Sequence, residues 1–191
     1  MSQTKRSQST PAADALTFNV SGLLAEPPGT VREIEIAAPA LDLGVDLRQS
    51  RGSQGHLRLT RTNRGLLVQG RFSTGLELVC SRCLRDIDYS VTFEMDEEAL
   101  PSVDLVSGKP VEASAEPDEF RLSDHHELEL EGEFRDAIVL AEPIAPVCRK
   151  DCPGLCTICG RELASGNHDH PDDEVDPRLE VLRQFREGEQ D

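Results

Sequence analysis

The sequence predicts an α+β protein: a mainly antiparallel β-sheet domain with one covering helix, a C-terminal zinc knuckle and a short terminal helix. Three observations predict this architecture. Long stretches of the first half alternate apolar and polar residues, the period of strands with one buried face. Near residue 130 apolar residues recur every three or four positions, the period of a helix. Four cysteines then fall within twelve positions near residue 150.

The N-terminal half begins with a polar segment, residues 1–14, that we expect to be a disordered leader. The β-rich domain is expected to span residues 15–147. Its first alternating segments are LTFNVSGLL (16–24), VREIEI (31–36) and LDLGVDL (41–47). Each is predicted to be a strand, and the last has four apolar residues on one face, which are Leu41, Leu43, Val45 and Leu47.

The alternation is most regular between residues 56 and 95. HLRLTRT (56–62), LLVQGRFS (66–73) and IDYSVTFEM (87–95) predict an antiparallel meander with one face in solvent. The acidic segment 101–119 is rich in Pro, Gly and Ser and is expected to be an exposed loop. ELEGEFRDAIVLAEP (129–143) then has helical periodicity and is predicted to cover the sheet.

The C-terminal region, 148–191, is expected to comprise the zinc knuckle, an acidic linker and a terminal helix within DPRLEVLRQFRE (176–187). Its four cysteines are Cys148, Cys152, Cys156 and Cys159. In GLCTICG two glycines flank a Cys-x2-Cys pair, the form in which the backbone folds around a tetrahedral zinc ion. Four sulfur ligands leave no position for substrate, so such a site is structural.

A second pair, Cys80 and Cys83, has three interpretations. It is half of a zinc site, a thioredoxin-like redox pair, or two thiols at the edge of the core. A redox pair requires a helix N-terminus to lower a thiol pKa, whereas this pair follows a predicted strand.

The number of cysteines leaves the zinc ligands open, since six cysteines exceed the four ligands of one zinc ion. Either Cys156 and Cys159 complete a site with Cys80 and Cys83, or the C-terminal four form their own site. In a further alternative His168 and His170 join Cys80 and Cys83 in a second site, although a His-x-His among aspartates is more often a solvated linker. We expect about one zinc ion per chain.

The formal net charge is -16, and the acidity is concentrated in the middle of the chain, where residues 94–136 carry 15 acidic and 3 basic side chains. Between Asp46 and Glu77 there is no carboxylate. We call this stretch the arginine window, and its arginines are Arg48, Arg51, Arg58, Arg61, Arg64 and Arg71. Guanidinium groups on one sheet face suit phosphate oxygens of RNA. The alternatives are pairing with the protein's own carboxylates and contact with a protein partner.

Other classes of protein are disfavoured. The sequence contains no Gly-rich phosphate loop and no nucleophile elbow, so we expect no catalytic residues and no small-molecule substrate. It also lacks an apolar run of the ~18 to 20 residues that a membrane span needs. The protein is therefore expected to be cytoplasmic, without membrane contact.

Four segments together resemble the YceD family, the large ribosomal RNA subunit accumulation proteins of bacteria and plastids. In order they are CSRCLRDIDYSVTFEMDEE (80–98), EFRDAIVLAEPIAPVC (133–148), CRKDCPGLCTICGREL (148–163) and DPRLEVL (176–182). The resemblance covers about residues 15 to 185 and implies a non-catalytic factor for the synthesis, processing or stability of large-subunit rRNA. It also implies that Cys80 and Cys83 are the family's most widespread cysteines, whereas the C-terminal cluster occurs in part of the family.

Three functional hypotheses follow. In the first, the protein contacts large-subunit rRNA through the arginine window. In the second, it is an acidic binding module that holds a basic ribosomal protein without touching RNA. In the third, Cys80 and Cys83 form a CxxC thiol oxidoreductase.

Overall fold

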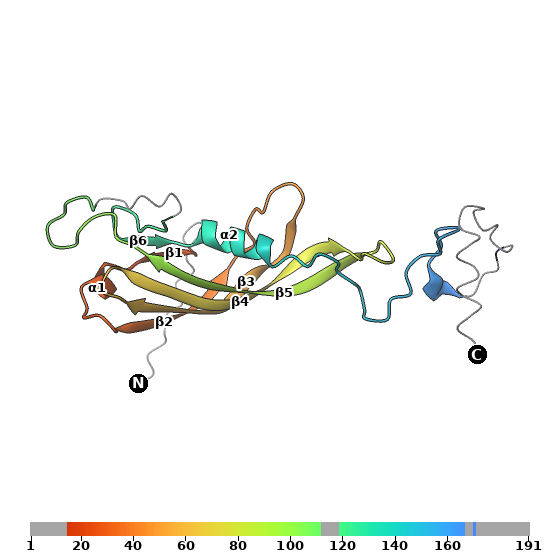
Figure 1. Ribbon diagram of the computed structural model, residues 1–191, viewed down its shortest axis with the longest axis horizontal. Helices are drawn as coiled ribbons and strands as arrows, with labels where there is room; N and C mark the ends of the chain where they lie inside the picture. The colour runs from red at the N-terminus through yellow and green to blue at the C-terminus, as the bar shows by residue number, and fades with distance from the viewer. Residues whose placement is uncertain (1–14, 112–118, 167–169, 171–191) are drawn as a thin grey trace, which may run out of the picture. The chain divides into compact units, whose positions relative to one another are not determined.

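The computed structural model in Figure 1 describes residues 15–111, 119–166 and 170. Contacts divide the chain into two compact units, residues 1–81 with 85–148, and residues 82–84 with 149–191. The predicted disordered leader, the predicted terminal helix and His168 lie outside the described residues.

The larger unit is built on a four-stranded antiparallel sheet whose strand order, β2-β3-β4-β5, follows the chain. Strand β2 spans Val31–Ala38, β3 Arg48–Arg61, β4 Leu66–Val79 and β5 Asp86–Ala99. The predicted antiparallel meander is therefore confirmed, and its last three strands are longer than the alternating segments that predicted them.

Alternation along the strands determines which face is buried. In β5, Val91, Phe93 and Met95 are buried while Thr92 and Glu94 are exposed. Successive side chains of a strand point to opposite faces, so one regular sequence supplies both a core face and a solvent face. The wet face predicted from the sequence is thus present.

Helix α2, Glu131–Leu140, covers the buried face of the sheet, as predicted (Figure 1). Its buried residues are Phe134 and Ile138. The ring of Phe134 lies 4.6 Å from that of Phe72 on β4 and 5.3 Å from that of Phe93 on β5, measured between centroids. Aromatic pairs at these separations add stability beyond their buried area, so this cluster anchors the helix.

A smaller sheet pairs β1, Thr17–Asn19, with β6, Glu127–Glu129. The strand predicted over 16–24 is therefore correct for only part of its length, because the chain turns into the short helix α1, Ser21–Leu24. Leu23 and Leu24 are both buried. Two consecutive residues cannot both face the core from one side of a strand, whereas one turn of helix allows it.

The strand predicted over 41–47 is wrong. Within this segment Leu47 is buried but Val45 is 93% exposed. The Asp42 carboxylate accepts a hydrogen bond from the Gly44 N–H at 3.0 Å, and Gly44 has a φ of 104°. An Asp that bonds the backbone two residues on, beside a glycine with positive φ, makes a turn, and here this local preference overrides the alternation.

The remaining elements are short. Residues 101–111 of the predicted acidic loop contain a turn closed by the bridge between Val103 and Pro110, and residues 112–118 lie outside the described part of the chain. The smaller unit contains the 3-10 helix η2, Leu163–Ser165.

We predict that Gly70→Ala lowers the free energy of unfolding by about 1 to 3 kcal/mol, the usual cost of overpacking. A Cβ at Gly70 would lie 2.4 Å from the Phe72 ring and 2.8 Å from the His56 carbonyl oxygen. The matched control is Gly132→Ala in α2, where a Cβ meets nothing within 4 Å. Alanine is the better helix former, so the control should stabilise by up to about 1 kcal/mol. Urea unfolding followed by circular dichroism measures both, and equal effects would contradict the packing described.

Candidate metal centre and charged surfaces

Cys80 and Cys83 lie in the turn that connects β4 to β5, as predicted. The turn is closed by a hydrogen bond from the Cys80 N–H to the Arg85 carbonyl at 2.8 Å. Leu84 has a φ of 55°, which reverses the chain directly after Cys83. Both cysteines are buried. Because they occupy a turn between strands, the helix N-terminus that a thioredoxin-like pair requires is not provided here.

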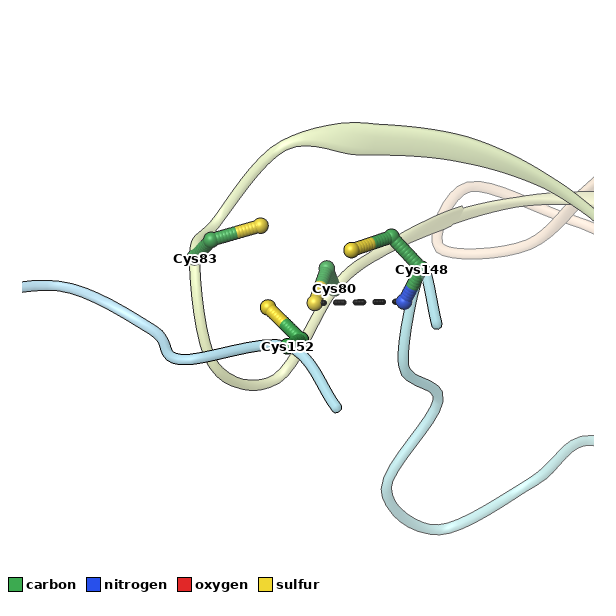
Figure 2. Close-up of side chains that lie close together, drawn as sticks. All are labelled: Cys80, Cys83, Cys148 and Cys152. Atoms are coloured by element: carbon green, nitrogen blue, oxygen red, sulfur yellow. Dashed lines mark hydrogen bonds between the residues drawn. The ribbon is translucent and has the colours of Figure 1, made fainter. Parts of the chain in front are cut away.

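Cys148 and Cys152 meet this turn (Figure 2). The Ser81 N–H donates to the Pro146 carbonyl at 2.8 Å, and the Cys148 N–H donates to the Cys80 sulfur at 3.4 Å. The Arg82 guanidinium donates to the Cys152 carbonyl at 3.0 Å. Backbone and guanidinium donors therefore hold the 146–152 segment beside the turn.

The four sulfur atoms of Cys80, Cys83, Cys148 and Cys152 lie within 4.8 Å of one another, and their side chains converge in Figure 2. Zinc–sulfur bonds of about 2.3 Å place tetrahedral sulfurs about 3.8 Å apart, so a small contraction brings this group to a metal. The N–H aimed at the Cys80 sulfur is the kind of donor that stabilises a coordinated thiolate. This group, which we call the four-cysteine centre, can hold a metal ion and is compatible with zinc.

The structure groups the cysteines differently from both alternatives considered from the sequence, because Cys80 and Cys83 lie with Cys148 and Cys152. Cys156 and Cys159 instead lie with His170 in a separate group of potential ligands. His170 is thus beside Cys156.

The arginines of the window lie next to carboxylates and carbonyl oxygens of the protein itself. Three of its ion pairs are Arg51–Asp88 at 3.2 Å, Arg58–Glu33 at 3.6 Å and Arg64–Glu98 at 3.6 Å. These pairs lie at the surface, where an ion pair contributes about 0 to 1 kcal/mol.

The other arginines of the window have similar surroundings. Arg71 pairs with Glu94 directly across from it on β5. Arg61 donates to the carbonyl oxygens of Leu24 and Gly65, each at 3.0 Å. Arg48 lines a groove that also contains three carboxylates, those of Glu77, Asp86 and Asp88. RNA contact through these residues stays a prediction, and any phosphate would compete with acceptors already in place.

A groove of about 370 Å³ lies between β5 and α2. We call it the acidic groove. Phe93 and Met95 are among the residues that line it, and so are five carboxylates, those of Glu94, Asp96, Glu97, Glu133 and Asp136. Burial raises the pKa of Glu133 above its ordinary value, and the nearby charges of Glu97 and Asp136 raise it further. The neighbouring carboxylates therefore contribute to this shift after burial, and a groove lined by like charges favours a cation.

None of the helices in the described ranges is long and apolar enough to cross a bilayer.

Fold and site together define a small, mostly β protein with a cysteine centre that can hold a metal. The profile of the family described as "Large ribosomal RNA subunit accumulation protein YceD" matches residues 68–186. The chain belongs to this family, which confirms the resemblance drawn from its motifs. The matched range includes β5, α2 and every cysteine, but only Arg71 of the arginine window.

Similar proteins occur in mycobacteria. Proteins of Mycobacterium tuberculosis and Mycobacterium bovis, both named as uncharacterized, are 33% identical over 135 residues, which is 71% of this chain and 62% of theirs. A Mycobacterium leprae protein, also named as uncharacterized, is 30% identical over 124 residues, 63% of this chain and 53% of its own. The chain thus spans less than two thirds of these relatives. No solved structure matches it.

We predict that Cys152→Ser removes about one metal ion per chain, since a serine hydroxyl is a poor replacement for one of four thiolates. Metal analysis of protein purified under reducing conditions without chelator measures this loss. The control is Ser81→Ala in the adjacent turn, which keeps the backbone N–H that bonds Pro146. Unchanged metal content in Cys152→Ser would contradict the assignment of the four-cysteine centre.

We predict that Glu133→Gln stabilises the protein at neutral pH by no more than about 1 kcal/mol, because solvent screens a partly exposed charge. The folded-state pKa of Glu133 is raised, so its ionised form opposes folding above that pKa. The benefit should vanish as the pH falls through the raised pKa, where the wild-type carboxyl is protonated. Urea unfolding between pH 7 and pH 4 tests this, with exposed Glu129→Gln as control. A benefit that grows toward low pH would contradict the account.

Proposed function

We propose that this protein is a non-catalytic cytoplasmic factor that supports the synthesis, processing or stability of large-subunit rRNA. The observation that carries the proposal is the family match over residues 68–186, whose description names accumulation of this RNA. The groups assembled in the structure suit binding: a converging set of thiols and a groove lined by like charges.

The proposal includes one structural zinc ion at the four-cysteine centre. Cys80, Cys83 and Cys152 are buried, and four thiolates complete a tetrahedron without room for substrate. A structural zinc can contribute on the order of 10 kcal/mol to the folding of a segment with little core of its own. The 146–152 segment has that character, since Cys152 is its one buried side chain.

We further propose that the partner is a basic ribosomal protein, held at the acidic groove. Two observations favour this over direct RNA contact. The arginines of the window face the protein's own carboxylates and carbonyls, whereas the groove gathers like charges whose repulsion a cationic side chain would relieve. The family match also includes the whole groove but only one arginine of the window. Complementary charge would also accelerate the encounter of the two proteins.

The competing hypothesis, direct contact with rRNA, retains a physical basis. The ion pairs of Arg58, Arg64 and Arg71 are exposed, with half or more of each arginine side chain accessible to solvent. Exposed pairs are weak enough for phosphate to replace the carboxylate. Matched sets of neutralising substitutions therefore separate the two hypotheses.

We predict that the wild-type protein recovers a ribosomal protein from native lysate in a salt-sensitive way. Neutralising the groove with Glu97→Gln, Glu133→Gln and Asp136→Asn should lower the recovered amount at least tenfold. The matched control neutralises three arginines of the window whose partners lie outside the groove, with Arg51→Gln, Arg58→Gln and Arg64→Gln, and should retain this recovery. Each set removes three charges from the same unit, but the groove set raises the net charge from -16 to -13 and the arginine set lowers it to -19. The comparison therefore tests which of the two surfaces is needed.

The same two variants are then expressed in cells that lack the wild-type protein. Loss of the wild-type protein should lower the ratio of large-subunit to small-subunit rRNA. Expression of the arginine variant should restore this ratio, whereas expression of the groove variant should not. Restoration by the groove variant alone, with loss of rRNA binding in the arginine variant, would overturn the choice of partner in favour of RNA. An rRNA ratio that does not respond to loss of the protein would overturn the function itself.

A further inference from the structure

The second group of potential ligands lies at the end of a short hairpin in the smaller unit. An antiparallel bridge pairs Leu155 with Glu162, and the Leu163 N–H donates to the Gly154 carbonyl at 3.1 Å. Inside this bridge the Cys156 N–H donates to the Arg161 carbonyl at 2.8 Å. These bonds fix the loop that carries Cys156 and Cys159.

The loop has the form of a metal-binding knuckle. The Gly160 N–H donates to the Cys156 carbonyl at 2.9 Å, and Gly160 has a φ of 70°, which lets the backbone turn tightly after Cys159. The Ile158 N–H points to the Cys156 sulfur at 3.4 Å. An amide directed at sulfur from inside a Cys-x2-Cys loop stabilises a coordinated thiolate.

His170 completes the group. Its Nε2 atom lies 3.2 Å from the Cys156 sulfur, and the ligand atoms of Cys156, Cys159 and His170 all lie within 4.8 Å of one another. A zinc ion with Zn–S bonds of about 2.3 Å and a Zn–N bond of about 2.0 Å would space sulfur and nitrogen by about 3.5 Å. The observed spacing is therefore close to that of a shared ion.

We propose that Cys156, Cys159 and His170 bind a second zinc ion, separate from the four-cysteine centre. The two groups share no ligand, so each can be filled independently. A hydrogen bond between thiol and imidazole would account only for the short distance between the Cys156 sulfur and His170 Nε2. It would explain neither the third ligand atom, that of Cys159, nor the amide aimed at the Cys156 sulfur.

The second zinc is the more labile of the two. Its site has two thiolates and one imidazole, and its coordination is completed by an exchangeable ligand such as water. Cys159 is exposed and Cys156 is half-buried, whereas three of the cysteines in the other centre are buried. Fewer thiolates and greater exposure both favour earlier loss to a chelator.

The test uses the full chain, purified under reducing conditions without chelator and supplied with zinc. Metal analysis should give about two zinc ions per chain, and X-ray absorption about three sulfur ligands per zinc on average. Cys159→Ser and His170→Gln should each leave about one zinc with four sulfur ligands. The matched control is His125→Gln, at an exposed histidine in the larger unit, which should leave both ions in place. Addition of a chelator to the wild type should remove the zinc with fewer sulfur ligands first.

Replacing His170 with another zinc ligand distinguishes loss of the ion from loss of the fold. His170→Cys should keep about two zinc ions and raise the average to about 3.5 sulfur ligands per zinc. One zinc with four sulfur ligands in the wild type, or two ions unaffected by His170→Gln, would overturn the proposal. This outcome is distinct from failure of the four-cysteine centre, which would show as zinc content insensitive to Cys152→Ser.

Discussion

The antiparallel pairing of β4 with β5 positions the cysteine turn, the anchor of helix α2 and the acidic groove. It runs without a register shift from Leu66 opposite Ala99 to Val79 opposite Asp86. At its end the chain must reverse, and that turn carries Cys80 and Cys83. Along its length the same register places Phe72 beside Phe93 beneath α2. One hydrogen-bonded ladder therefore positions two of the four ligands of the four-cysteine centre, the anchor of the helix and the floor of the acidic groove.

Charged side chains are paired on the solvent face of the sheet, whereas beside α2 like charges lie close together. Across the solvent face, acidic and basic residues on neighbouring strands compensate each other, as Arg71 and Glu94 do. Beside α2, in contrast, burial raises the pKa of Glu133, and repulsion from Glu97 and Asp136 raises it further. Such a departure from local stability is expected where a surface serves a partner more than the fold. A cationic side chain in the groove would relieve this repulsion, which links the energetics of the fold to the proposed function.

Much of the fold was predictable because it follows from side-chain periodicity. The meander over 56–95 and the helix ending before Pro143 each have a regular pattern of buried residues. The failures at 21–24 and 41–47 come from local effects, consecutive apolar residues in one case and an Asp–Gly turn in the other. The grouping of the cysteines was not predictable, because spacing constrains neighbours in sequence. It does not determine which distant segment meets the β4–β5 turn, and here that depends on hydrogen bonds such as Ser81 to Pro146.

The proposed function requires that the acidic groove beside α2 contacts a basic ribosomal protein in the cell. Leu140 lines the groove and is 86% exposed, so a photoreactive amino acid placed there in the native organism reports directly what lies against it. The same probe at Val45, which is 93% exposed and is not among the residues that line the groove, is the control. We expect a crosslink from position 140 to a lysine- and arginine-rich protein of the large subunit. A crosslink from this position to rRNA, or identical products from both positions, would contradict it.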